Sequence, residues 1–591
     1  MRFVKYLVAF AFALCIVTGV TRAQGTVVFL ASGSSALFNE LGQAAFTSGS
    51  TNTPCLWTQG STSSIELLDE RTSPATAETG TVWVTWGPGT GTCAAPTGSF
   101  NIYFYMSLDS VLGNRCYFEV NPGGTPGCEL SFTIAASTAG ANEICYPQPA
   151  SSCTEYEDNA SIPQAVISAL NPSTPLHVNA AGTDIRPEDA KFASYRMFSA
   201  CGSGIWRQPF DQGLRQVYGL GYQTSTNGVG TSVESYYSSK TFHVLDFNIQ
   251  GDDPIETSYA VPGYSVSTVG AQPIIVVVTG SNITAAKDIP GFTLANFYEG
   301  VAGRTTDLIG PTTTAPVTVL VREPLSGTYN TFEWSMINNS QFHNSQDDNN
   351  CSGSVFYSNP MNLQGTNGQV LSYRRRVIGT SQMVQELQAA TTDTIGYFFW
   401  SQSNANAPSS FSDTGSKYLT VNGVDPLQVY PSTDGSNGNT CASGTTIPSV
   451  FDGVIPGSDS SHPICNVTFG GLNAGDYPVW SALRVVSTSP APAAVTNLIS
   501  AVQTLDSTQH DFITLANLKF WHSHSYLPAL AINVGANGNT LNPATPNDLC
   551  NAPGALAEFG NDAGGTNVYK QLNADFCSDF GNIDGLINKA N

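Results

Sequence analysis

The chain has 591 residues, a formal net charge of -22 at pH 7 and only 11% charged residues. A negative charge of this size argues against nucleic acid and anionic membranes as partners, because both would repel the protein. The length exceeds what a single hydrophobic core usually serves, so at least two structural units are expected.

The N-terminal segment is typical of a secretory signal peptide. Two basic residues precede an apolar run over residues 6–20, and a small-residue cleavage pattern ends at Ala23. Cys15 follows Leu14, where a lipoprotein site needs a small residue, so no lipid anchor is expected. No later segment offers roughly 18 uninterrupted apolar residues. The sequence therefore predicts a periplasmic or secreted protein without membrane insertion after signal cleavage.

The cysteines point to an oxidising compartment. There are 13, and setting aside Cys15 in the leader leaves an even number. We expect them to be paired, so thiol titration of the unfolded, unreduced protein should find almost no free thiol. The sequence does not fix the pairing, although Cys55 and Cys93 flank a strand in a Ser/Thr/Gly-rich segment, and short loops could be closed by Cys116/Cys128, Cys145/Cys153, Cys441/Cys465 and Cys550/Cys577.

Three junctions in the first part of the chain share one pattern, a strand that ends in polar residues before a helix. The strand over 25–31 runs into Gly33-Ser34-Ser35, and the next, over 101–108, runs into Asp109-Ser110. A short strand after residue 175 ends in Thr183-Asp184. Each polar residue has a plain reading as a helix cap or turn residue, and Asp109 is as good a cap as Ser110.

The most informative junction lies in the second half of the chain. A β-branched, apolar strand over 315–321 is followed by Arg322, then by Ser326-Gly327-Thr328 at the start of a helix. Hydroxyls, backbone N–H groups and the helix dipole then face one point, and the arginine fork can hold two oxygens. This combination predicts an anion site, whereas a capping serine after an edge strand is the alternative.

Further elements complete the outline of the chain. Apolar strands are expected over 273–278, 394–398 and 477–486, and a helix over 515–521. The first and last of these strands are interpreted as crossovers between two structural units.

The order of these motifs resembles the phosphate-binding, substrate-binding proteins of ABC transporters, which belong to the type II periplasmic binding-protein superfamily. Arg322-x-x-x-Ser326-Gly327-Thr328 reproduces that family's anion loop, and Gly33-Ser34-Ser35 resembles its N-terminal loop. Ala36 or Leu37 stands where the family usually has a ligand-binding threonine. The resemblance spans most elements between residues 25 and 530, interrupted by large insertions.

The resemblance implies a two-lobed α/β fold with disulfide-bearing β/loop insertions, in which a phosphate or related oxyanion is held between the lobes. It implies no enzymatic activity, no metal, no cofactor and an ABC-type permease as partner. The implied ligand-binding residues are Ser34, Ser35, Ser110, Asp184, Arg322, Ser326, Gly327 and Thr328. The expected organisation is a signal peptide over 1–23, one lobe over 24–272 with insertions near 47–98 and 122–171, a second lobe over 273–474, and a return to the first over 475–591.

Two other classes of function fit the same sequence. A secreted hydrolase such as a phosphatase is one, although neither a Gly-x-Ser-x-Gly nucleophile elbow nor a His-Glu-x-x-His zinc motif occurs. A surface or adhesion protein that kept the two-lobed scaffold and lost its ligand is the other. A colorimetric phosphatase assay and a phosphate titration separate these three readings.

Overall fold

The structure is a computed structural model. The residues it describes are 24–69, 76–118, 127–141, 144–147, 153–155, 161–185, 187, 190, 214–216, 241–243, 264–299, 303–310, 315–322, 325–336, 362–364, 370–377, 379–401, 415–427, 450–458, 462, 464, 467–505, 510–518, 520–525 and 583–588. The signal peptide expected over 1–23 lies outside them. No helix among these residues is long and apolar enough to cross a membrane.

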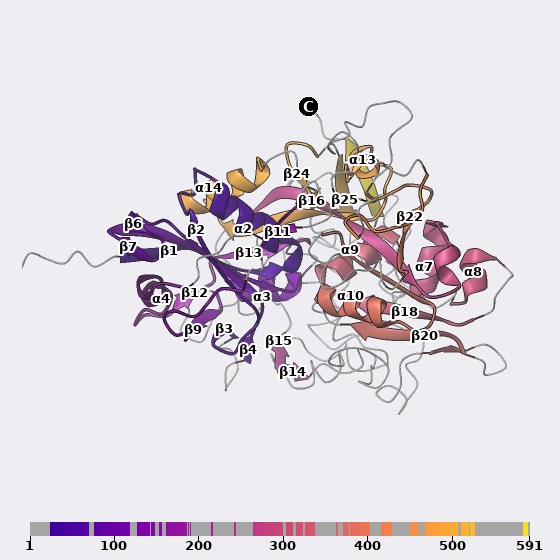
Figure 1. Ribbon diagram of the computed structural model, residues 1–591, viewed down its shortest axis with the longest axis horizontal. Helices are drawn as coiled ribbons and strands as arrows, with labels where there is room; N and C mark the ends of the chain where they lie inside the picture. The colour runs from indigo at the N-terminus through magenta and orange to yellow at the C-terminus, as the bar shows by residue number, and fades with distance from the viewer. Residues whose placement is uncertain are drawn as a thin grey trace, which may run out of the picture.

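One large mixed sheet runs through the molecule (Figure 1). Its strand order is β19 (Asn362–Gln364), β20 (Val370–Val377), β18 (Val317–Arg322), β21 (Thr394–Phe399), β16 (Tyr264–Thr279), β23 (Trp480–Thr488), β13 (Ala180–Thr183), β1 (Gln24–Ser34), β8 (Ser99–Leu108), β5 (Val82–Trp86) and β2 (Cys55–Gln59). We call β13, β1, β8, β5 and β2 the first part of the sheet, and β19, β20, β18 and β21 the second part.

Strands β16 and β23 join the two parts. β16 pairs with β23 from Tyr264 to Pro273 and with β21 from Ile274 to Thr279, always antiparallel. From Thr268 onward β16 is buried, and its apolar run from Ile274 to Val278 is typical of a strand covered on both faces. One strand therefore belongs to both parts, as expected for a crossover near Pro273, while the lobe boundaries themselves stay a prediction.

Helices cover both faces of the sheet. In the first part, α2 (Phe38–Thr47) and α14 (Ala493–Gln503) pack together on one face, and α3 (Ser110–Phe118) and α4 (Gln164–Leu170) lie on the other (Figure 1). The second part carries α7 (Gly291–Glu299), α9 (Gly327–Met336) and α10 (Gly379–Ala389). Apolar side chains of these helices and strands form two buried clusters, one of which extends over both parts. The predicted α/β fold is confirmed.

Shorter elements complete the described chain. They are η1 (Ser35–Leu37), β3 (Ile65–Asp69), β4 (Thr76–Glu78), β6 (Thr90–Thr92), β7 (Ala95–Thr97), β9 (Glu129–Phe132), β10 (Cys145–Pro147), β11 (Cys153–Glu155), β12 (Leu176–His177), β14 (Leu214–Gln216), β15 (Thr241–His243), η3 (Ile283–Ala285), β17 (Asp288–Ile289), α8 (Thr305–Ile309), β22 (Lys417–Val421), α13 (Gly470–Asn473), β24 (Ile513–Thr514), β25 (Phe520–Ser525) and β26 (Ile583–Asn588).

Helix α3 lies unusually close to strand β1, and glycines make this possible. A Cβ added to Gly113 would overlap the backbone of Gly33, and one added to Gly33 would overlap the carbonyl oxygen of Gly182. Gly33 also has a φ of 137°, a conformation that favours glycine. The end of β1, the start of α3 and the end of β13 are thereby drawn together.

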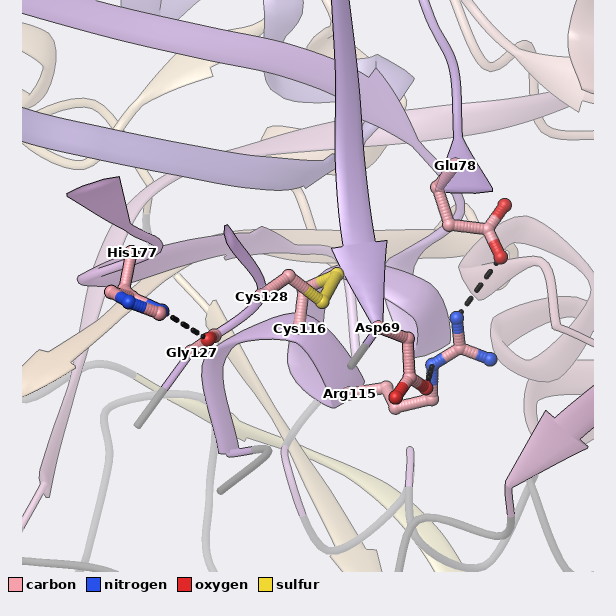
Figure 2. Close-up of a disulfide and its surroundings, with 7 residues drawn as sticks. All are labelled: Asp69, Glu78, Arg115, Cys116, Gly127, Cys128 and His177. Carbon is pink, nitrogen blue, oxygen red and sulfur yellow. Dashed lines mark hydrogen bonds and ion pairs between the residues drawn. A yellow bond between two sulfur atoms is a disulfide. The ribbon is translucent and has the colours of Figure 1, made fainter. Parts of the chain in front are cut away.

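The far end of α3 is fixed by a disulfide and by ion pairs (Figure 2). Cys116 is bonded to Cys128, and the buried Arg115 Nη2 lies 3.0 Å from Glu78 Oε1 while its Nε lies 3.7 Å from Asp69 Oδ2. A second disulfide joins Cys55 and Cys93. Buried ion pairs and disulfides restrict how far a helix can shift, so the start of α3 has a defined position.

The disulfide between Cys116 and Cys128 is one of the short loops considered in the sequence, and Cys55–Cys93 encloses the strand noted there. The side chains of Cys145 and Cys153, and all of Cys441, Cys465, Cys550 and Cys577, lie outside the described residues. The insertion expected near residues 47–98 contributes to the main sheet, because its strands β5 and β2 extend that sheet beyond β8.

The helix expected over 515–521 is wrong. Ile513, the first residue of β24, pairs with Ala271 of β16. A turn follows, in which Leu518 N donates to Thr514 O, and β25 begins at Phe520. The apolar spacing of Leu515 and Leu518 suits one turn as well as a helix, and pairing with β16 decides the outcome.

Candidate functional site

The carboxyl ends of parallel strands gather the candidate residues. In the first part, β1 is parallel to both β8 and β13; in the second part, β18 is parallel to β20. In α/β sheets, ligands usually bind just beyond such strand ends. The strands here end next to Ser34, Ser110, Asp184, Arg322 and Thr380.

Arg322 is the last residue of β18, and it is only 2% exposed. Its Nη1 donates to Thr380 Oγ1 at 3.1 Å, and its Nη2 forms an ion pair with Asp109 Oδ1 at 3.7 Å. Its backbone N donates to the hydroxyl of Tyr397 at 3.4 Å. Burying a guanidinium costs free energy unless it has partners of this kind. Here the partners come from both parts of the sheet.

Tyr397, which contacts the backbone of Arg322, belongs to a cluster of three aromatic rings. The ring of Tyr397 stacks on Phe332 with centroids 4.1 Å apart, and Tyr298 packs edge-on against both rings. Packed aromatic rings have few alternative rotamers, so the end of β18 is well supported.

Asp184 follows β13 and is buried, with 2% of its surface exposed. Its Oδ1 accepts a hydrogen bond from the Ser110 hydroxyl, and its backbone N donates to the same hydroxyl at 3.4 Å. The Ser34 side chain is a further hydrogen-bond partner of the carboxyl group. Three strand ends of the first part thus meet at one carboxyl group.

Burial raises the pKa of the Asp184 carboxyl from 3.8 to about 7. Backbone hydrogen bonding, the charges of Arg322 and Arg484 and the hydrogen bond with Ser34 all lower this pKa, but less than burial raises it. Asp184 therefore changes charge near neutral pH, in contrast to an exposed aspartate.

The backbone of Asp184 is held from strand β23. Arg484 Nη1 donates to the Asp184 carbonyl oxygen at 2.9 Å, and the Ser481 hydroxyl donates to the same oxygen. Both donors are buried, so the carbonyl is anchored away from solvent. Arg484 therefore positions Asp184 and adds a positive charge behind it.

The start of α9 lies against this cluster from the second part of the sheet. A Cβ added to Gly327 would overlap the Asp184 carboxylate and the Ser110 hydroxyl. Nearby, Val111 N at the start of α3 donates to Leu325 O at 3.3 Å. The first turns of two helices from different parts of the sheet are therefore in direct contact, and a glycine is needed where they meet.

The serines also act as helix caps. Ser326 Oγ accepts a hydrogen bond from Tyr329 N at 3.2 Å, and Ser34 Oγ accepts one from Ala36 N at the same distance. A hydroxyl that accepts one bond still has a proton to donate, so capping does not exclude contact with an anion.

The structure brings most of the predicted site residues together and leaves one apart. Ser34, Ser110, Asp184, Gly327 and Arg322 belong to the contacts described above. Ser326 and Thr328 are buried on either side of Gly327. Ser35, in contrast, is exposed in the short helix η1.

Four residues of the cluster were not predicted as site residues. Asp109 appeared only as an alternative cap, and Ser481 and Arg484 only as part of a strand. Thr380 follows Gly379 at a fifth strand-to-helix junction, and this pattern was available in the sequence as a signal. The roles of Asp109 and Arg484 depend on contacts between distant segments, for which the sequence carries no local pattern.

Comparisons with known proteins give matches among solved structures alone. No protein-family model and no curated protein matches the chain. A high-affinity periplasmic phosphate-binding protein, PfluDING, is 12% identical, with 83% of this chain and 90% of that chain covered and a TM-score of 0.32. A phosphate-binding protein from Stenotrophomonas maltophilia is 13% identical, with 70% and 84% covered and a TM-score of 0.30. An ABC-type phosphate transport receptor from Vibrio cholerae is 13% identical, with 43% and 74% covered and a TM-score of 0.26.

Proposed function

We propose that the protein is an extracytoplasmic solute-binding protein that captures phosphate, or a closely related oxyanion, between the two parts of its sheet. The observation that carries this proposal is the meeting of buried Arg322 and buried Asp184 beside the first turn of α9. A guanidinium and a helix N-terminus both bind anions, whereas a carboxylate favours a ligand that can donate a hydrogen bond to it. Protonated oxyanions of phosphate meet both requirements.

The ligand would enter when the two parts of the sheet move apart and would be enclosed when they close. Arg322 would form a bidentate hydrogen bond to the anion through its guanidinium group. The start of α9 would supply backbone N–H groups and the hydroxyls of Ser326 and Thr328. Ser34 and Ser110 would turn their hydroxyl groups from Asp184 to the ligand on binding. The exposed Ser35 would contribute least.

The organisation we propose has three components. Residues 1–23 direct export, residues 24–272 and 475–591 form one lobe, and residues 273–474 form the other. The resemblance of the Arg322 loop to the anion loop of ABC-type binding proteins is the motive for naming a permease as partner. Binding without chemical conversion of the ligand is the proposed activity.

Asp184→Asn is expected to lower the preference for phosphate over sulfate by about tenfold or more. An ionised carboxylate can only accept hydrogen bonds, so it repels sulfate, which carries no proton at neutral pH. An asparagine amide can also donate, so sulfate becomes acceptable even if phosphate still binds. Calorimetric titrations of both anions into the wild type and the variant measure the ratio.

The same carboxyl group predicts how sulfate binding depends on pH. Because the pKa of Asp184 is about 7, the group is protonated below that pH and can then donate to sulfate. The dissociation constant for sulfate should therefore rise on the order of tenfold per pH unit above 7 in the wild type, and lose this dependence in Asp184→Asn. An unchanged anion ratio together with an unchanged pH profile would show that Asp184 does not face the ligand.

A further inference from the structure

Asp109 occupies an unexpected position for an acidic residue, given the function proposed above. It lies between the end of β8 and the start of α3, where its carbonyl oxygen accepts a hydrogen bond from Gly113 N at 2.9 Å. Its carboxylate faces Arg322 with the oxygen and Nη2 3.7 Å apart. Asp109 belongs to the first part of the sheet and Arg322 to the second, so this ion pair joins the two parts.

A helix N-terminus favours an acidic residue, and this alone would explain an aspartate at the start of an exposed helix. Here, however, the carboxylate is only 14% exposed and points at the arginine that the ligand needs. Asp184 faces the same guanidinium closely enough to have its pKa lowered by it. A bound oxyanion would be a third negative group beside one arginine, with Arg484 the further cation near Asp184.

We propose that Asp109 is a specificity-determining residue that acts as an internal counter-ion and makes the site prefer singly charged, proton-bearing oxyanions over dianions. In the ligand-free protein Asp109 pairs with Arg322 and favours contact between the two parts. On binding, the ligand shares Arg322 with Asp109, and each additional negative charge on the ligand increases the repulsion. A monoanion with two acidic protons can offer one to Asp184 and one to Asp109, which is the chemistry of dihydrogen phosphate. This inference rests on the proposed phosphate-binding function.

The test compares the wild type with Asp109→Asn by calorimetric titration with inorganic phosphate. The variant keeps the size and capping ability of the side chain and removes its charge. We expect it to bind inorganic phosphate roughly tenfold more tightly at about pH 8, where the dianion dominates, and to show a smaller gain at about pH 6. Asp476→Asn, which makes the same substitution at an exposed position, is the matched control and should behave like the wild type.

The outcomes separate this inference from the function on which it rests. Tighter binding by Asp109→Asn supports the inference, including the case in which only the variant binds detectably. Equal or weaker binding by the variant, when the wild type binds, overturns the role of Asp109 and leaves phosphate binding intact. If neither protein binds phosphate, both proposals fall. Circular dichroism of each variant confirms that the fold is kept.

Discussion

Arg322→Ala is expected to weaken phosphate binding by at least about tenfold and by up to several hundredfold. Charged hydrogen bonds contribute roughly 1.5–3 kcal/mol each, and a guanidinium can offer two to one ligand. Because Arg322 is almost fully buried, water cannot easily take over these contacts. Isothermal titration calorimetry with inorganic phosphate measures the loss.

Two further variants give this experiment its controls. Arg322→Lys keeps the charge but loses the planar fork, so its affinity should fall between those of the wild type and Arg322→Ala. Lys287→Ala removes a positive charge from an exposed side chain between η3 and β17 and should change phosphate affinity little. If Arg322→Ala binds phosphate as tightly as the wild type does, Arg322 is a structural residue.

Gly327→Ala is expected to reduce phosphate affinity by about tenfold to a hundredfold. The added methyl group would overlap the Asp184 carboxylate and the Ser110 hydroxyl, and overpacking of a buried contact typically costs about 1–3 kcal/mol. Alanine is a better helix former than glycine, so a loss cannot come from helix propensity. The same titration measures the affinity, and thermal unfolding measures the effect on stability.

Gly291→Ala is the matched control, because Gly291 is also the first residue of a helix. There an added Cβ would meet only the side-chain amide of Asn422, with its closest atom 3.2 Å away. Asn422 Oδ1 also accepts a hydrogen bond from Gly291 N at 2.8 Å, so a small shift of that side chain should cost a little stability while phosphate affinity stays at the wild-type value. Wild-type affinity in Gly327→Ala would mean that the two helix starts do not close around the ligand.

The sequence predicts the strand ends of this site well, and the reason is local. Polar residues directly after apolar strands are visible as a pattern, and parallel strands bring their ends to one edge. Ser34, Ser110, Asp184 and Arg322 were found in this way, and the structure brings them together. The need for glycine at position 327 also follows from the loop motif, although the group it approaches does not.

The sequence could not predict the contacts that form only where the two parts of the sheet meet. Asp109 and Arg322 are far apart in the chain, and only the tertiary fold sets their ion pair. Arg484 reads as an ordinary residue of an apolar strand until β23 is placed beside β13, where Thr183 is opposite it. Ser35 marks the limit of the pattern, because one residue of shift at a strand end separates a buried hydroxyl from an exposed one, and its contact with a ligand stays a prediction.

Titration of the purified, ligand-free wild-type protein with inorganic phosphate, and in parallel with sulfate, tests the proposed function most directly. The protein should be unfolded and refolded beforehand to remove any ligand carried through purification. We predict saturable binding of one phosphate per chain at about pH 8, with sulfate binding at least about tenfold weaker. No heat of binding with phosphate, or equal affinity for the two anions, would contradict the account of Arg322 and Asp184 as a phosphate site.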